Sequence, residues 1–288
     1  MHVAQIFKQK KPVVSFEIFP PKRDEALKSI DGTLEVLTEL KPDFISVTFG
    51  AGGSLTNSKT VEIAGKIKRN YGIEAVAHLT CLNYSKAEII EMVNNLKAND
   101  IENILALRGD HNPNLEPKND FKHASDLIEF VKQNSDLGIS AACYPEGHPE
   151  SANLSEDVLN LKHKVDVGAE HLVSQLFFDN NIFYRFTELC KVAGINVPIE
   201  AGIMPVINKA QIERMVTLCG ASLPDNMKRI LDKYADNKEA LFDAGIAYAT
   251  SQIIDLLAAG VDGIHIYTMN NPRVAMKICE SIKNVISR

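Results

Sequence analysis

Short apolar runs alternate with longer amphipathic stretches along the whole chain. Eight runs, rich in β-branched and aromatic residues, predict buried strands at 13–19, 44–47, 75–79, 104–107, 139–144, 171–176, 197–203 and 263–267. Between them, apolar residues recur at helical spacing, as in Leu27, Ile30, Leu34, Leu37 and Leu40, or in Ile89, Met92, Val93 and Leu96. This regular alternation predicts parallel strands joined by crossover helices.

The turns between helices and strands favour a (β/α)8 TIM barrel. Five predicted helices end at a glycine or an Asn/Asp directly before a strand, at 71–73, 99–101, 168–170, 193–195 and 259–261. The alternative is a doubly wound sheet, which normally has a glycine-rich turn after its first strand, whereas this chain has Phe19-Pro20-Pro21-Lys22. Residues 211–259 exceed one βα unit, so we expect extra helices before the last strand, with a break at Leu223-Pro224-Asp225.

Composition indicates one domain over residues 1–288 and no polyanionic partner. The chain is 45% hydrophobic, has a net charge of −6 and contains no lysine- or arginine-rich block, so we expect binding to neither nucleic acid nor membranes. The N-terminus lacks the apolar core of a secretory signal. Five scattered cysteines without a C-x-x-C motif predict a reduced, cytoplasmic protein.

Glu17 is the first candidate for chemistry, because it interrupts the apolar run from Val13 to Phe19. Burial without a fixed cation disfavours the ionised form of a carboxyl group, so a raised pKa and a general-acid role are expected. The alternative is an edge strand in which Glu17 points to water.

Other polar residues follow the predicted strands at their carboxyl ends, where barrel enzymes place their active sites. They are Thr48 to Gly53, His78, Arg108 to His111, Tyr144 to Glu150, Gln175, and Tyr267 with Thr268. Arg108 and Asp110 could equally form a surface ion pair. A predicted helix after Glu150 places Asp157, Asn160 and His163 on one face, with Lys164 beside them. His78, His148, His163 and His265 lack the spacing of zinc ligands, so no metal site is expected.

Six motifs in order resemble those of methylenetetrahydrofolate reductases. They are Ser15 to Pro21, Ser46 to Ala51, His78 to Cys81, Leu107 to Asp110, Ala142 to Glu150 and Gln175 to Asp179. The similarity runs from about Phe16 to Thr268, and the length resembles bacterial forms that consist of the catalytic barrel alone.

The resemblance implies a barrel that binds FAD and reduces 5,10-methylenetetrahydrofolate to 5-methyltetrahydrofolate in a ping-pong reaction with NADH or NADPH. Glu17 matches the family's general acid, which protonates the departing nitrogen of the folate. Asp110 matches an aspartate that orients the folate ring and tunes the flavin.

The resemblance also assigns binding positions. For FAD they are Thr48, Phe49, Gly50, Ala51, His78, Arg108, Gly109, Asp110, Ala124, Tyr144, His148, Ser151, Asp157, Asn160, His163 and Lys164, with Arg108 and Lys164 facing the pyrophosphate and Asp157 a ribose hydroxyl. For folate they are Glu17, Thr48, Asp110, Gln175, Gln211, Met215 and Arg273, with Gln175 shared by the nicotinamide.

The chain departs from the family pattern at four positions. Phe49 replaces a common tyrosine, His163 a common arginine and Met215 a common aromatic residue. Asn271 occupies the slot of a folate-contacting arginine, and Arg273 is the candidate substitute at the glutamate tail.

Two questions stay open at this level. The alternative function is a non-catalytic flavin- or folate-binding subunit of a one-carbon complex, and the presence of both Glu17 and Asp110 argues against it. The sequence does not choose between NADH, NADPH and a protein donor, and relatives suggest a homo-oligomer, either a dimer or a tetramer.

Overall fold

Eight strands are found at the eight predicted positions, with ends that differ by a few residues at most. The computed structural model describes residues 1–21, 27–49, 54–110 and 118–286, with the backbone alone for 27–29 and 54–58. In these ranges the strands are β1 (Val13–Ile18), β2 (Phe44–Val47), β3 (Glu74–Thr80), β4 (Asn103–Leu107), β5 (Gly138–Cys143), β6 (His171–Ser174), β7 (Ile199–Ile203) and β8 (Gly263–Tyr267).

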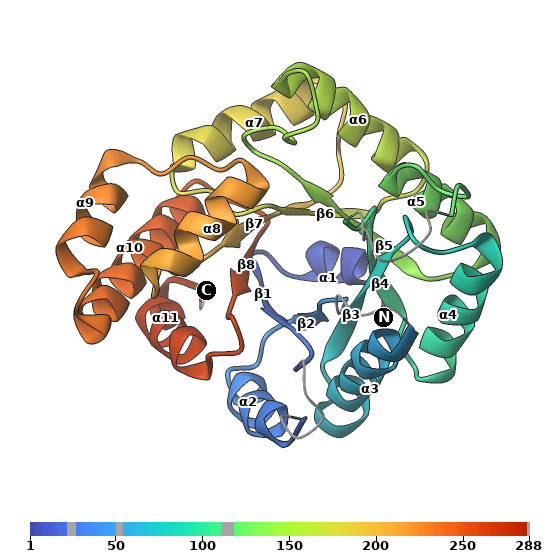
Figure 1. Cartoon of the computed structure of the whole chain (residues 1–288), viewed down its shortest axis with the longest axis horizontal. Coiled ribbons are helices and arrows are strands. Elements are labelled where there is room, and N and C mark those ends of the chain that lie inside the picture. The colour runs from blue at the N-terminus through green and yellow to red at the C-terminus, as the bar shows by residue number, and fades with distance from the viewer. Residues whose placement is uncertain (22–26, 50–53, 111–117, 287–288) are drawn as a thin grey trace.

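The strands form a closed parallel barrel in chain order (Figure 1). Its closure is the pairing of β1 with β8, in which Ser15 lies opposite His265 and Glu17 opposite Tyr267. A doubly wound sheet would leave β1 unpaired with β8, so the predicted (β/α)8 barrel is confirmed.

Helices surround the barrel and fill the long stretch before the last strand. Those described are α1 (Val3–Gln9), α2 (Leu27–Glu39), α3 (Ser54–Tyr71), α4 (Lys86–Ala98), α5 (Ala124–Asn134), α6 (Leu154–Asp166), α7 (Asn180–Val192), α8 (Lys209–Cys219), α9 (Asp225–Tyr234), α10 (Lys238–Ala258) and α11 (Pro272–Ile286). The expected extra helices are α8 and α9 together with the long α10, and Pro224 caps the start of α9 as the predicted break required. Within these residues no helix combines the length and hydropathy needed to cross a bilayer.

Alternation along each strand separates an outer core from the barrel interior. On β1, Phe16 and Ile18 are fully buried in the outer core, in the same cluster as Leu34 and Leu37 of α2. Successive side chains on a strand point to opposite faces. Ser15 and Glu17 therefore point into the barrel.

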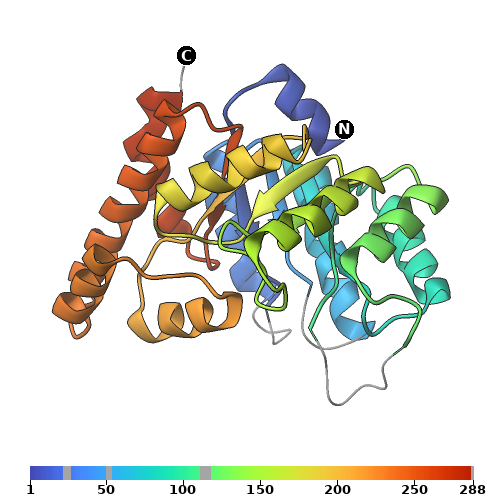
Figure 2. The same ribbon diagram turned by 90° about the horizontal axis from the view of Figure 1, so that it is seen from above.

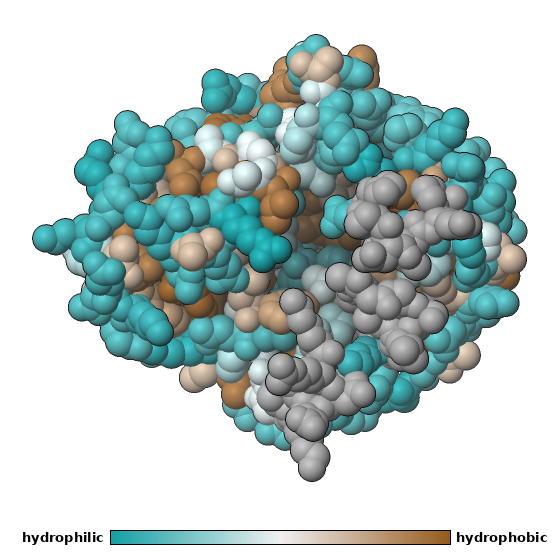
Figure 3. Space-filling view, in the orientation of Figure 1, coloured by the Kyte–Doolittle hydropathy of each residue, from teal (hydrophilic) through white to brown (hydrophobic). Residues whose placement is uncertain are grey.

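The short helix α1, which the sequence pattern did not predict, closes the amino-terminal end of the barrel. Val3, Ile6 and Phe7 of α1 pack in one cluster with the inward residues of the strands, which include Val13 and Phe44. Figure 2 shows α1 at one end of the barrel and α8 at the other. The polar residues of the strand ends must therefore use the opposite, carboxyl-terminal face, which is hollowed at its centre in Figure 3.

Asn103 at the start of β4 anchors α1. Its side chain is 1% exposed, its Oδ1 accepts a hydrogen bond from the Val3 amide at 2.8 Å, and its Nδ2 donates to the Met1 carbonyl at 2.9 Å. Both main-chain groups would lose a partner without this side chain.

We expect Asn103→Ala to lower the free energy of unfolding by about 1–3 kcal/mol, because it leaves buried main-chain polar groups unsatisfied. Urea denaturation measures the change, and amide exchange of α1 should accelerate. Asn94→Ala, on an exposed position of α4, is the matched control. Equal stability of the two variants would show that Asn103 does not hold α1.

Candidate functional site

Glu17 lies between two histidines in the mouth of the barrel. Its side chain is 19% exposed, and its Oε2 is 3.3 Å from His78 Nε2 on β3 and 3.5 Å from His265 Nε2 on β8. The alternative of an edge strand with Glu17 in bulk water is therefore wrong. A carboxylate and two imidazoles can share a proton at this point.

The expected rise in the pKa of Glu17 is also wrong. Desolvation is the largest influence and raises the pKa, but hydrogen bonds and charges from His265 and His78 outweigh it and lower the pKa to about 2. The sequence argument assumed burial without a cationic partner. The closed barrel supplies two imidazoles as partners, from strands that are distant in the sequence.

A buried chain of polar groups continues from Glu17 into the barrel. His265 Nδ1 lies 2.6 Å from Ser15 Oγ, which donates to Glu200 Oε1 at 2.7 Å. Glu200 Oε2 is 3.5 Å from His171 Nε2, and His171 Nδ1 is 2.9 Å from Ser140 Oγ. Glu200 is fully buried and His171 and His265 are each 1% exposed. These groups connect β1, β5, β6, β7 and β8 through the interior.

Sequence reasoning did not select Ser15, His171 or Glu200, and the only chemical role that it considered for His265 was that of a zinc ligand. Each occupies an inward position of a largely apolar strand. The available signal was this recurrence of polar residues at inward positions on several strands. It becomes a cluster only once the barrel closes.

Tyr267 forms part of the wall beside Glu17. Its hydroxyl donates to the Ser174 carbonyl at 2.7 Å, and burial, followed by the charge of Glu17, raises its pKa well above the usual value. Gly202 makes room for the ring, because a Cβ there would lie 2.8 Å from it.

The loop after β8 is fastened to the end of β1. Thr268 Oγ1 donates to the Glu17 carbonyl at 2.7 Å. The Asn270 amide accepts from the Phe19 N–H at 2.9 Å and donates to the Phe19 carbonyl at 2.8 Å. These three hydrogen bonds fix the backbone that carries Glu17.

Arg108, at the end of β4, forms a forked ion pair with Glu150. Its Nη2 lies 2.7 Å from Glu150 Oε1, and the pair lowers the pKa of Glu150 to about 2. Arg108 thus pairs with Glu150 from the next βα loop and not, as the alternative expected, with Asp110, whose side chain is exposed.

The loop after β5 and helix α6 gather the other predicted FAD residues. The Tyr144 and His148 rings meet edge to face with centroids 4.7 Å apart, and Ser151 Oγ donates to Asp157 Oδ1 at 3.0 Å. Desolvation is the main cause of the lowered pKa of His148, and the negative charges of Glu150 and Asp157 oppose it. Arg108 and Lys164 also lower the pKa, so the neighbours of His148 include charges of both signs.

Lys164 of α6 is a desolvated cation in the same cluster. Its Nζ donates to the Ala142 carbonyl at 3.1 Å, and burial lowers its pKa while Asp157 raises it. Asn160 and His163 on the same helix are exposed, so the predicted common face of α6 divides into a buried and an exposed part.

The remaining predicted cofactor positions border the mouth. Thr48 follows β2 and its N–H donates to the Ile18 carbonyl, and Phe49 meets the Tyr84 ring edge to face at 5.9 Å. Gly109 has φ +83°, and a Cβ there would lie 2.9 Å from Thr80. Ala124 begins α5. Gly50 and Ala51 lie outside the described residues.

The other predicted folate residues lie after β6, on α8 and on α11. Gln175 follows β6, its N–H donates to the Cys143 carbonyl at 2.7 Å, and its Oε1 accepts from the Leu176 N–H. Gln211 and Met215 lie one turn apart on α8, both half-buried. Arg273 is tied to α10, where its guanidinium forms a forked ion pair with Glu239 and stacks 4.1 Å from the Phe242 ring centroid.

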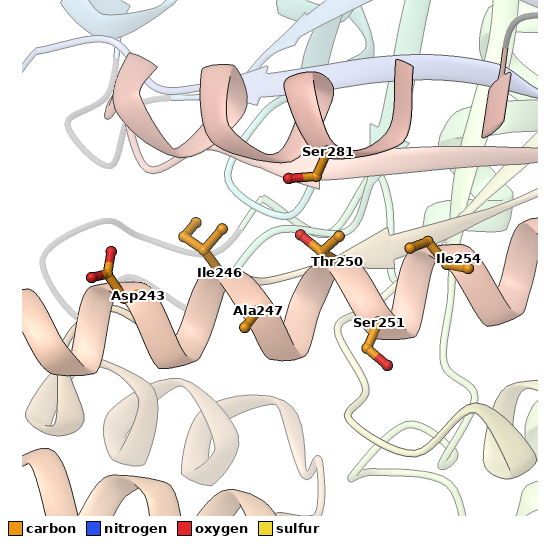
Figure 4. A pocket seen from close by; sticks show the side chains of 7 residues that line it. All are labelled: Asp243, Ile246, Ala247, Thr250, Ser251, Ile254 and Ser281. Carbon is orange, nitrogen blue, oxygen red and sulfur yellow. The ribbon is translucent and has the colours of Figure 1, made fainter. Parts of the chain in front are cut away.

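A separate groove on the outer surface is lined mainly by apolar and hydroxyl side chains. It is lined by Asp243, Ile246, Ala247, Thr250, Ser251 and Ile254 of α10, with Ser281 of α11 (Figure 4). Asp243 is its single charged side chain among the described residues. In the same described part of the chain, no group of three or more His, Cys, Asp or Glu residues is arranged to hold a metal ion.

Solved structures share this fold at low sequence identity. One is an uncharacterized protein from Clostridium thermocellum that binds two copies of 5-methyl-5,6,7,8-tetrahydrofolic acid, with a TM-score of 0.67, 15% identity and 99% of both chains covered. Another is a dihydropteroate synthase from Coxiella burnetii in complex with pteroic acid, with a TM-score of 0.52, 14% identity and 95% and 94% covered. At such identities they support the barrel fold alone.

Sequence relatives are much closer. The chain is 37% identical over 270 residues to the 5,10-methylenetetrahydrofolate reductase of Escherichia coli strain K12, covering 93% of this chain and 90% of that one. It is 36% identical over 279 residues to methylenetetrahydrofolate reductase (NADH) 1 of Zea mays, covering 92% of this chain and 47% of that one. The family model described as methylenetetrahydrofolate reductase matches residues 2–283. The chain therefore belongs to the methylenetetrahydrofolate reductase family.

Proposed function

We propose that this protein reduces 5,10-methylenetetrahydrofolate to 5-methyltetrahydrofolate with electrons from NADH or NADPH. The observation that carries the proposal is Glu17, held between two imidazoles at the catalytic face of the barrel. Bound FAD would accept a hydride from the nicotinamide and pass it to the folate in a ping-pong sequence. Membership of the family supports the overall reaction.

Glu17 acts in this proposal as the general acid of the folate half-reaction. The methylene bridge accepts hydride only after its ring opens to an iminium cation, and this step needs a proton on the departing nitrogen. With a pKa of about 2, Glu17 is ionised at neutral pH, so the proton must come from its imidazole partners. The Nε2 atoms of His78 and His265 lie 3.3 and 3.5 Å from Oε2, so either ring would be placed to deliver that proton, and exclusion of water by substrate would shift it toward the carboxylate.

Asp110 is proposed to orient the folate ring and to favour the iminium cation. It lies exposed at the end of β4, and its charge acts on both Arg108 and Tyr144. A negative charge at this rim position would stabilise a developing cation.

The residues around the loop after β5 fit a dinucleotide such as FAD. Arg108 offers a forked donor, and Lys164 is a desolvated ammonium group that a phosphate oxygen would stabilise. Asp157, buried and hydrogen-bonded to Ser151, can accept from a ribose hydroxyl. His78 Nε2 and Ser46 Oγ are buried without a hydrogen-bond partner of good geometry, which leaves polar atoms available near the mouth.

For folate, Gln175, Gln211 and Met215 are proposed to contact the ring system together with Thr48. The ion pair between Arg273 and Glu239 must open if Arg273 is to reach the glutamate tail. We further expect a homo-oligomer in a reducing cytoplasm. The five cysteines are free, which agrees with that compartment.

Purified protein should be yellow, or become so with added FAD. Anaerobic NADH or NADPH should bleach the flavin, and 5,10-methylenetetrahydrofolate should restore its colour with formation of 5-methyltetrahydrofolate. Stopped-flow absorbance measures both steps. Failure to bind FAD would overturn the proposal, and a flavin that methylenetetrahydrofolate does not reoxidise would favour the non-catalytic subunit.

Glu17→Gln should slow flavin reoxidation by methylenetetrahydrofolate by about 10²–10⁴-fold, because this half-reaction loses its proton donor. Reduction of the flavin by nicotinamide needs no such proton and should stay near the parent rate. Glu35→Gln, the same change at an exposed position of α2, is the control. Equal losses in the two half-reactions would contradict the assigned role.

Glu150→Gln should tighten FAD binding a few-fold, because Glu150 competes with the pyrophosphate for Arg108 and an exposed ion pair contributes at most about 1 kcal/mol. Fluorescence titration of the apoprotein with FAD measures the Kd. Glu188→Gln on α7 makes the same charge change at another exposed site. Weaker binding in Glu150→Gln would mean that Glu150 helps to hold the cofactor.

A further inference from the structure

Glu200 is a buried titratable residue that the proposed reaction leaves without a role. It lies on β7 with no exposed surface, and its Oε1 accepts from the Ser15 hydroxyl at 2.7 Å. Its Oε2 has no hydrogen-bond partner of good geometry, although His171 Nε2 is 3.5 Å away and His265 Nδ1 3.9 Å away. A carboxyl group in this position is costly to bury, so its retention calls for a physical explanation.

The direction of the Ser15 hydrogen bond decides the state of His265. A hydroxyl group has one hydrogen, and Ser15 donates it to Glu200. The contact of 2.6 Å between Ser15 Oγ and His265 Nδ1 must therefore use a hydrogen on Nδ1. In the neutral imidazole, Nε2 then carries only a lone pair, and this atom faces Glu17 Oε2.

We propose that Glu200 is a positioning residue for the general acid, which it serves by holding His265 in the Nδ1–H tautomer through Ser15. This inference rests on the proposed folate reduction. An Nε2 lone pair facing Glu17 can hold one transferable proton between the two groups, and with Glu17 ionised the imidazole carries it. The lone pair of the folate nitrogen takes that proton, which leaves a Glu17 carboxylate beside a neutral Nδ1–H imidazole, and no oxidation state changes.

The opposite arrangement would remove the acid. If Ser15 donated to His265 Nδ1, the neutral ring would carry its hydrogen on Nε2 and donate it to a Glu17 carboxylate. The contact would then be satisfied with Glu17 already deprotonated. Glu200 excludes this arrangement because it accepts the only hydrogen that Ser15 has.

Other titratable groups face Glu17, Glu200 and His265 from neighbouring strands. They are His78 on β3, His171 on β6 and Tyr267 on β8. His171 touches Glu200 but not the Ser15 hydroxyl, and its ring packs 4.7 Å from the Phe7 ring. His171→Phe therefore changes the same layer of the barrel while leaving the Ser15–Glu200 hydrogen bond in place.

The test is the imidazole ¹⁵N spectrum of protein labelled at histidine, with the His265 signals assigned by their loss in His265→Gln. The parent protein should show His265 with a hydrogen on Nδ1 throughout, as the imidazolium while it carries the shared proton and as the neutral Nδ1–H tautomer after losing it. Glu200→Met, which removes the acceptor at similar size, should show the Nε2–H form, and His171→Phe should resemble the parent. An Nε2–H tautomer in the parent overturns the proposal even where no variant folds, and so does an unchanged tautomer in Glu200→Met.

Rapid kinetics adds a second readout. In Glu200→Met the folate half-reaction should slow by tenfold or more and lose rate at a pH about one unit lower than in the parent, because the proton is held less tightly. Flavin reduction by nicotinamide should keep its parent rate. The ¹⁵N result is independent of folate chemistry, so an inactive parent with the Nδ1–H tautomer would reject the proposed function while keeping the assigned hydrogen-bond direction. A parent-like pH profile in Glu200→Met would reject the role of Glu200.

Discussion

The hydroxyl of Ser15 is the contact on which the interior of this barrel depends. It joins His265 and Glu200, two titratable groups with almost no exposed surface, and it lies on the strand that carries Glu17. Burying a polar group without a partner costs free energy, so a polar side chain in the interior needs a hydrogen-bond partner from another strand. Pairing of β1 with β8 brings Ser15 opposite His265, which makes closure of the barrel and satisfaction of its polar interior one event.

Aromatic packing on the amino-terminal side of these buried polar residues fixes their position along the barrel axis. Phe44 meets the rings of both His171 and His265, and Phe7 of α1 also packs against His171. Aromatic walls limit the movement of the imidazoles and keep water out from the amino-terminal end. The mouth is then the open route to Glu17, and the loop fastened by Thr268 and Asn270 fixes its rim.

The fold was predictable because it depends on period and turn chemistry, which are local. Eight apolar runs, amphipathic helices and turn residues such as Gly72 and Gly260 were sufficient for the barrel and for the extra helices after β7. The short α1 was missed because it has only two turns, and its role as a plug depends on a cavity that exists only in the closed barrel. The residues of the rim were predicted because parallel strands bring their carboxyl ends to one edge.

The electrostatics of the site could not be predicted in the same way. In the sequence Glu17 looked like an isolated acid in an apolar strand, where burial would raise its pKa. His78 and His265, which lie 61 and 248 residues away, lower the pKa instead. The pairing of Arg108 with Glu150 and that of Arg273 with Glu239 likewise join segments from different βα units. Coulomb interactions depend on distance in space and on local burial, and neither quantity can be read from a stretch of sequence.

The proposed role of Glu17 as general acid makes two opposed demands on this residue, and the arrangement of its neighbours reconciles them. A carboxyl group buried with a raised pKa would hold its own proton, whereas one paired with fixed cations would lose it permanently. Imidazoles avoid both extremes, since they are cations only when they carry the proton in question. In this proposal the proton moves between Glu17 Oε2 and His265 Nε2, which lie 3.5 Å apart. Acid strength would then be a property of the cluster, and the groups that fix the direction of its hydrogen bonds would matter as much as the carboxyl group itself.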